Sequence, residues 1–225
     1  MEGGTNLVYN PYSEKVEQDF SRRMIVTGMS SLSVAPNTAS IKLEVITENE
    51  LLTQAQEENA YVMNRVIQSL LEVGVSRENI QTTAYHIHPM YDYVDGQQVF
   101  RAYQVRNGVT VMILNVGQAG TIIDIAVKNG VNSVSDIQFS VANSQQYYQK
   151  ALSNALQAAV AKAQTMAATL QVTLDPIPIK ITENFKEEPQ TFSTFAALEI
   201  SQTPIEPGKI VIEARVEAQF RYLEA

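Results

Sequence analysis

The fold is decided by the stretch Met24-Ile-Val-Thr-Gly-Met-Ser-Ser-Leu-Ser-Val-Ala-Pro-Asn-Thr-Ala-Ser-Ile-Lys-Leu-Glu-Val45, which alternates apolar and polar residues on both sides of a proline. Alternation with period two is typical of strands that have one buried face. Val34-Ala-Pro-Asn37 predicts a tight turn, because proline fixes its own φ, biases the residue before it toward extended geometry, and is followed by an asparagine that tolerates turns. We therefore expect two long strands joined in a hairpin.

The C-terminal stretch predicts the strand that completes this sheet. Its apolar residues occupy every second position: Ile210, Ile212, Ala214, Val216, Ala218 and Phe220. A strand with so regular a buried face is expected to fill a central position beside the opening hairpin. Both ends of the chain are then expected to meet in one sheet.

Three helices and further strands are predicted between these ends. The first helix opens with the capping-box pattern Thr53-Gln-Ala-Gln56 and closes at Gly74, and the second lies between Asn115-Val-Gly-Gln118 and Asn129-Gly130. The third runs from Asn143-Ser144 to Leu170 and is so rich in alanine that close packing on a sheet is expected. Its predicted apolar stripe is Tyr148, Leu152, Ala155, Ala159, Ala163, Met166 and Leu170.

The remaining segments read as strands. Ile80 to Leu114 has strand character throughout, with Asp95-Gly96 as a two-residue hairpin turn. Val134 to Val141 and Pro176 to Ile181 follow, the latter at a sheet edge because of its prolines. The order ββαββαβαββ predicts an α+β fold, with three helices packed on a largely antiparallel sheet, and is compatible with two ferredoxin-like halves. We expect residues 1–23 to form a tail and residues 24–225 a single domain that carries an apolar loop at 185–202.

Composition excludes several classes of function. The chain has 225 residues and a formal charge of −8, so it lacks the basic surface that nucleic acids attract, and no nucleic-acid partner is expected. It has no cysteine, which excludes disulfides and thiolate chemistry. No segment resembles a membrane span, and the first 30 residues lack the apolar core of a signal peptide. As the sequence stands we expect a cytoplasmic protein, or an exported or periplasmic one if a leader has been removed.

Several motifs together resemble one family. They are the Val26-Thr-Gly28 entry, Val34-Ala-Pro36, Ala55-Gln56 with Glu58-Asn-Ala60, Ile80-Gln-Thr-Thr83, Tyr85-x-Ile-x-Pro-x-Tyr91-Asp-Tyr93, Tyr103-Gln-Val-Arg-Asn107 and Thr203-Pro-Ile-Glu-Pro-Gly208. From about Met24 to the end, the chain resembles the SIMPL-domain family. This resemblance implies bacterial relatives linked to oxidative-stress defence, periplasmic immunogenic relatives and an animal relative that binds a signalling kinase. It implies no active site that can be transferred to this sequence.

One constellation could hold a metal. His86, His88 and Asp92 share a face of the predicted strand, so two imidazoles and a carboxylate could converge on zinc or copper. The alternative is that they are solvated polar residues opposite Tyr85, Ile87, Tyr91 and Tyr93. No cofactor is expected on that interpretation. The pairs Asp92 and Asp95, and Glu57 and Glu58, are expected to be solvated, and Ser30, Ser31 and Ser33 have no nearby base.

The sequence is compatible with two functions, one as an interaction protein and one as a ligand-binding protein. The sequence favours a non-enzymatic scaffold or interaction protein that assembles with itself, linked at most indirectly to stress defence, with another protein as a further partner. Its expected interface residues are Phe192, Phe195, Leu198 and Ile200, because a solvated loop should not carry so much apolar surface. The alternative is a metal-binding or small-ligand protein that uses His86, His88 and Asp92.

Overall fold

The structure is a computed structural model that describes residues 22–184, 190–192 and 203–224. It confirms the α+β class, but its strands form two sheets where one was predicted. The chain divides into two compact units: unit 1 holds the described residues up to Met29, Asn154–Asn184 and the described residues from Arg215, and unit 2 holds the others. The single domain expected for residues 24–225 stays a prediction, because β1, α3 and β9 each run through both units.

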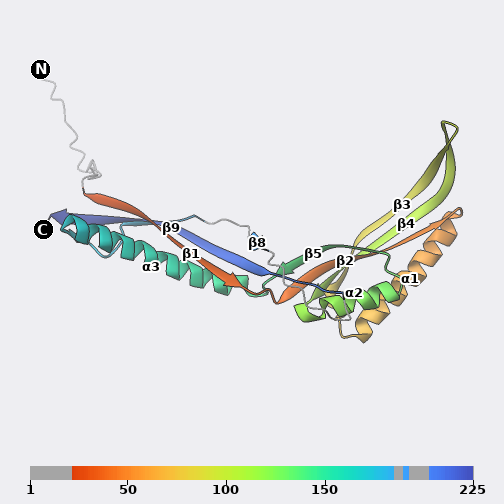
Figure 1. The fold of residues 1–225 in the computed structure, drawn as a ribbon, viewed down its shortest axis with the longest axis horizontal. Coiled ribbons are helices and arrows are strands. Elements are labelled where there is room, and N and C mark those ends of the chain that lie inside the picture. The colour runs from red at the N-terminus through yellow and green to blue at the C-terminus, as the bar shows by residue number, and fades with distance from the viewer. Residues whose placement is uncertain (1–21, 185–189, 193–202, 225) are drawn as a thin grey trace, which may run out of the picture. The chain divides into compact units, whose positions relative to one another are not determined.

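Unit 2 contains a four-stranded antiparallel sheet with the order β3-β4-β2-β5. Its strands are β2 (Thr38–Asn49), β3 (Ile80–Val94), β4 (Gln97–Ile113) and β5 (Ser133–Ser140). Unit 2 also contains two helices. The first, α1 (Leu52–Glu72), is followed by the short 3₁₀ turn η1 (Arg77–Asn79), and the second, α2 (Ala119–Lys128), is preceded by the turn η2 (Val116–Gln118). Figure 1 shows α1 and α2 on one side of this sheet, while β3 and β4 continue beyond it as a two-stranded ribbon.

The core of unit 2 lies between the sheet and these helices. Ile41, Leu43 and Val45 of β2 expose at most 1% of their surface, and Val66 and Leu70 of α1 expose none. We call this helix-covered face of the sheet the inner face and the opposite one the outer face. Burial of each such aliphatic side chain stabilises the fold by about 1.5–3 kcal/mol, which explains why the alternation along β2 is so regular.

Three local predictions can be compared with the structure: the start of α1, the end of α1 and the turn of the β3–β4 hairpin. The predicted capping box is wrong: the N-cap is Leu51 without a side-chain cap, and Asn49 Oδ1 accepts a hydrogen bond from the Leu51 N–H at 2.9 Å. The predicted stop is confirmed, since Gly74 has a φ of +91° that side chains rarely adopt. Asp95 and Gly96, with φ values of 50° and 79°, form the expected two-residue turn.

Unit 1 packs one helix, α3 (Ser144–Leu170), on a sheet with the order β1-β9-β6. Its strands are β1 (Arg23–Val34), β6 (Val172–Leu174), β7 (Lys180–Glu183) and β9 (Lys209–Glu224). The alanine-rich helix does pack closely, because a Cβ at Gly28 of β1 would collide with the carbonyl of Ala155 and the methyl of Ala159. The predicted stripe is partly wrong: the buried positions include Ala163 and Ala167, while Met166 and Leu170 are 42% and 60% exposed.

The opening hairpin is the main error of the sequence prediction. The strands on either side of Pro36 do not pair: β1 pairs with β9, and β2 pairs with β4 and β5. The turn is instead held by β5, because Asn37 donates its N–H to the Ser140 carbonyl at 3.1 Å and its Oδ1 accepts from the Ala142 N–H at 2.8 Å. The predicted central place of the last strand is confirmed, since β9 pairs with β1 on one side and with β6, β7 and β8 (Gln190–Phe192) on the other.

Candidate functional site

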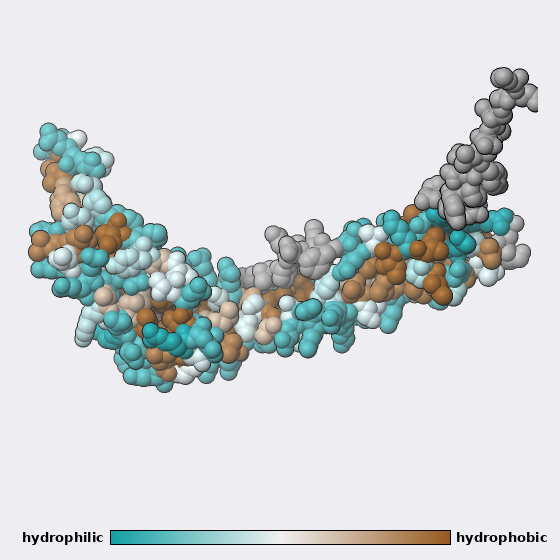
Figure 2. Space-filling model, turned by 180° about the vertical axis from the view of Figure 1, so that it is seen from behind, coloured by the Kyte–Doolittle hydropathy of each residue, from teal (hydrophilic) through white to brown (hydrophobic). Residues whose placement is uncertain are grey.

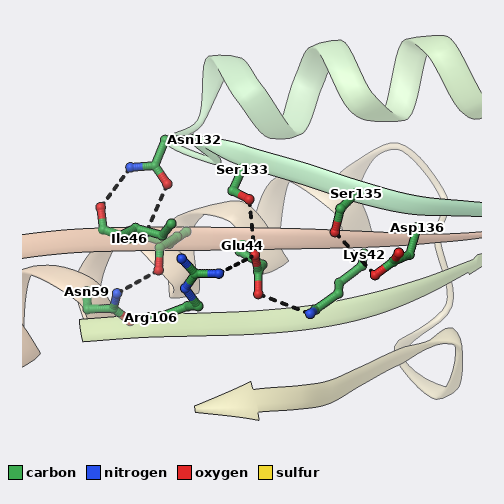
Figure 3. Close-up of polar contacts among 10 residues, drawn as sticks. Lys42, Glu44, Ile46, Asn59, Arg106, Asn132, Ser133, Ser135 and Asp136 are labelled. Carbon is green, nitrogen blue, oxygen red and sulfur yellow. Dashed lines mark hydrogen bonds and ion pairs between the residues drawn. The ribbon is translucent and has the colours of Figure 1, made fainter. Parts of the chain in front are cut away.

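The outer face of the four-stranded sheet carries a buried carboxylate. Glu44, in the middle of β2, exposes 3% of its side chain, although α1 and α2 lie on the opposite face of the sheet. Its Oε2 accepts a hydrogen bond from Ser133 Oγ of β5 at 3.0 Å and lies 3.5 Å from Nη1 of Arg106 on β4. Its Oε1 lies 3.3 Å from the Lys42 ammonium. Figure 3 shows this cluster, in which one carboxylate connects three adjacent strands.

The position of Glu44 depends on the glycine opposite it. Gly108 is the cross-strand partner of Glu44, and a Cβ there would lie 3.2 Å from both the Glu44 Cγ and its Oε1. Two cations and a hydroxyl compensate the cost of burying the carboxylate, as a buried charge requires. The cluster therefore holds the register of β4, β2 and β5. Within the described residues Oε2 accepts both hydrogen bonds, while Oε1 has the ion pair with Lys42 and no hydrogen-bond donor.

Two asparagines extend this polar framework. Asn132 donates its side-chain amide to the Ile46 carbonyl at 2.7 Å and accepts from the Ile46 N–H at 2.9 Å, which continues the β2–β5 ladder beyond the strand end (Figure 3). Asn59 of α1, 1% exposed, donates to the carbonyls of Val45 and Val105 at 2.9 and 3.1 Å. These bonds tie α1 to the two central strands of the sheet.

The structure brings together two of the three predicted metal ligands. His86 and His88 lie opposite Arg106 and Gln104 on the outer face, and their rings stack with centroids 6.2 Å apart and planes inclined by 19°. Asp92 lies past a register shift that follows Met90, and its Oδ1 is 3.9 Å from Nε of Arg101. Within residues 22–184, 190–192 and 203–224, no three His, Cys, Asp or Glu side chains are close enough to hold a metal ion.

The β3–β4 ribbon beyond α1 is the other notable surface. We call residues 85–103 the arm. Pairing of Tyr91 with Phe100 and of Tyr93 with Gln98 places these four side chains on the inner face, where Tyr91 and Phe100 meet edge to face at 6.0 Å and Phe100 packs against Tyr103 at 5.1 Å. The hydrophobic side chains of the arm that remain exposed are Tyr85 (51%), Ile87 (37%), Tyr91 (44%), Tyr93 (76%), Val94 (54%), Val99 (48%) and Phe100 (42%). Figure 2 shows hydrophobic patches on the arm, at upper left.

Comparison with known proteins now identifies the family. The sequence model of SIMPL, described as a protein of unknown function (DUF541), matches residues 24–220. The chain belongs to the SIMPL family. It is 27% identical over 166 residues to the 26 kDa periplasmic immunogenic protein of Brucella melitensis, covering 72% of this chain and 66%, just under two thirds, of that protein.

Other SIMPL-family relatives are similarly distant. An uncharacterized protein, YggE of Edwardsiella ictaluri, is 24% identical over 204 residues, which cover 88% of this chain and 85% of YggE. The human interleukin-1 receptor-associated kinase 1-binding protein 1 is 26% identical over 125 residues, 56% of this chain and 44% of that protein. The sequence-based assignment to this family is confirmed.

The other candidate residues of this SIMPL chain lie apart from the buried cluster. Glu57 and Glu58 are exposed on α1, and Asp95 is exposed in the hairpin turn. Ser31 and Ser33 are exposed on β1, in a different sheet from the Glu44 cluster. Of the expected interface residues, Phe195, Leu198 and Ile200 lie outside the described residues, as does the side chain of Phe192 in β8.

Sequence reasoning missed the Glu44 cluster. Its partners Arg106 and Ser133 are 62 and 89 residues away, so no local pattern contains them. The available signal was weak: Lys42 and Glu44 alternate with Leu43 and Val45, which predicts only a solvated outer face. A glycine in the interior of a strand can indicate the close approach of another group. Gly108 is therefore the residue whose presence could have indicated the cluster.

Proposed function

We propose that this SIMPL-family chain works without catalysis, as a protein that assembles with itself and binds another protein. The observation that carries the proposal is the arm, on which aromatic and aliphatic side chains are exposed over most of its length. Exposed apolar surface of this kind usually marks an interaction site. A two-stranded ribbon is also marginally stable by itself, so a partner that covers the arm would stabilise it.

The edge strands of the two sheets are protected against pairing with another strand. A partner is therefore expected to bind a face of the arm. β1 and β3 are edge strands of 12 and 15 residues. Lys162 of α3 donates to the Thr27 carbonyl of β1 at 2.7 Å, and Pro89 removes one N–H from β3. A lysine that binds an edge carbonyl and a proline within an edge strand both hinder the addition of a further strand. The apolar side chains of the arm have no comparable protection.

The relatives support an exported location and a binding role. Two Brucella relatives are named periplasmic proteins, and the human relative is named for binding a kinase. Among the described residues, none of the helices combines the length and apolar character that crossing a bilayer requires. We infer that the chain acts outside the cytoplasm, in place of the cytoplasmic location expected from the sequence, and that any part in stress defence is indirect.

Native mass is the direct test of this function. Light scattering across micromolar concentrations should report a mass above that of one 24.9 kDa chain, and affinity purification from the envelope fraction should recover another protein. A monomer at every concentration, with nothing recovered beyond an unrelated control bait, would contradict the proposal. Turnover that is abolished by substitution of a described residue would contradict the non-catalytic part.

A metal-binding function is the second candidate. It is favoured by the stacked pair His86 and His88, which presents two imidazoles on one exposed face of β3. With Asp92 near Arg101, this pair would need a further ligand from a bound small molecule or another chain to complete a tetrahedral zinc site. Elemental analysis of protein purified without a histidine tag distinguishes this function from the first.

A further inference from the structure

The two faces of the arm differ in chemistry. The inner face presents Tyr85, Ile87, Tyr91, Tyr93 and Phe100, none of which carries a charge. On the outer face His86 and His88 stack, and Asp92 lies 3.9 Å from Arg101, which also binds Glu48 at 2.9 Å. Val99, 48% exposed, also lies on this outer face. The arm therefore has an uncharged, aromatic inner face, like the packed face of one sheet in a β-sandwich, and an outer face of mixed character.

Only the base of the inner face touches a helix. Gln56 Nε2 of α1 is 3.3 Å from the Tyr85 hydroxyl, whereas Tyr91, Tyr93 and Phe100 are 44%, 76% and 42% exposed within the described part of the chain. The contacts among Tyr91, Phe100 and Tyr103 already fix these rings against one another. A prearranged aromatic cluster loses little conformational entropy on binding, which is why tyrosine is frequent among residues that dominate interface energies.

We propose that the inner face of the arm packs against the same face of a second copy, about a two-fold axis near the Tyr91–Phe100 pair. This inference rests on the self-assembly proposed above and names its surface. Two ribbons related in this way form a closed β-sandwich with the aromatic rings between them. Each copy then supplies the apolar layer that the other copy lacks.

Area and charge both favour a second copy as the occupant. The five inner side chains expose roughly 500 Å² per copy if each has about 200 Å² when free. Two copies would bury about 1,000 Å², the lower bound for a specific interface. A chain of charge −8 repels its own copies over most of its surface. The uncharged inner face is where that repulsion is weakest.

Single-cysteine crosslinking tests the geometry, and the chain contains no cysteine that would interfere. Gln98 and Val99 are adjacent, exposed and on opposite faces of β4, since they pair with Tyr93 and Asp92 respectively. Gln98→Cys should form a disulfide-linked dimer under mild oxidation, and Val99→Cys should not. Equal crosslinking of both variants, or none by Gln98→Cys, would overturn the two-fold arrangement.

Substitutions on the two faces test the energetics. Tyr91→Ser with Phe100→Ser should weaken the dimer at least about tenfold, while His86→Ser with His88→Ser should leave it unchanged. Gln98→Asp places like charges opposite each other in the dimer and should also weaken it. This variant provides the test if the serine variant fails to fold. A wild-type assembly that all three variants retain would overturn this interface but leave self-assembly intact. A wild-type monomer would overturn both proposals. Loss of assembly without Gln98→Cys crosslinking would overturn the two-fold arrangement and place the arm against a different surface of the second copy.

Discussion

Strands β3 and β4 pass from a covered part of their sheet to an uncovered one. Val105, Val109 and Val111 of β4 expose at most 1% of their surface at the covered base, while Tyr91 and Phe100 expose 44% and 42% on the arm. With 17 residues β4 spans about 58 Å, whereas the 21 residues of α1 span about 32 Å. The strand is longer than the helix that covers it, and a register shift between Met90 and Tyr91 keeps Phe100 on the same face as Val105. The same pattern therefore serves an internal core at one end and an open face at the other.

The largest effect is expected where one face is buried along almost a whole strand. Deletion of residues 209–225 removes β9, whose Ile210, Val216 and Phe220 are at most 3% exposed, together with the pairing partner of β1. The loss should exceed the roughly 5–15 kcal/mol stability of a typical domain, so the product should be insoluble or unfolded by circular dichroism. Deletion of residues 1–20 should leave a cooperative melting curve. An unaltered melting curve after deletion of residues 209–225 would contradict the assignment of β9 to the core.

Matched substitutions at the covered base and on the arm measure how much each region contributes to the stability of the chain. Leu43→Ala at the base should lower the free energy of unfolding by about 2–5 kcal/mol, because Leu43 is completely buried. Tyr91→Ala on the arm should lower that of the monomer by no more than about 1 kcal/mol, since nearly half of the side chain is already exposed. Urea titrations at low protein concentration check both values. Equal losses would show that the arm is as well covered as the base.

Several elements could be predicted because their signals are local. The Asp95-Gly96 turn, the end of α1 at Gly74 and the buried side of β9 all depend on neighbouring residues. The separation of β1 from β2 could not be predicted, because a proline corner has the same local sequence whether its strands pair or enter different sheets. Nor does alternation reveal what covers a face. Tyr91 of β3 and Val105 of β4 lie on the same inner face, and the limited length of α1 explains why only Val105 is buried.

The outer face offers a second matched pair, with a smaller expected effect. Glu44→Ala removes a carboxylate that is 3% exposed and leaves Lys42 and Arg106 without their partner, so stability should fall by about 1–3 kcal/mol. Glu48→Ala removes a carboxylate on the same strand that is 39% exposed and pairs with Arg101, so the loss should stay within about 1 kcal/mol. Thermal melts at low and high salt separate the two, because only the exposed pair should weaken with salt.

Removal of the outer part of the arm tests whether that part contributes to the core of its own chain. Deleting residues 89–94 and 97–103 joins His88 to Asp95-Gly96 and then to Gln104, which already faces His88 in the ladder. The two-residue turn is kept, so the melting temperature at low protein concentration should change by only a few degrees. Light scattering should meanwhile report a monomer. A folded variant that still assembles would place the contact between copies outside the deleted residues.

The smallest effect is expected at the histidine pair. His86→Ala with His88→Ala removes two imidazoles from the exposed outer face of the arm, where substitutions change stability by about 0.5 kcal/mol or less. Their stacking at 6.2 Å joins two exposed rings and buries no core residue, so neither the melting curve nor the native mass should change. Tyr91→Ser with Phe100→Ser, further along the ribbon and on its inner face, is the control that should change the native mass. A stoichiometric transition metal that is present in the wild type and lost on the alanine replacement would reverse this assignment, because the outer face of the arm would then carry the function.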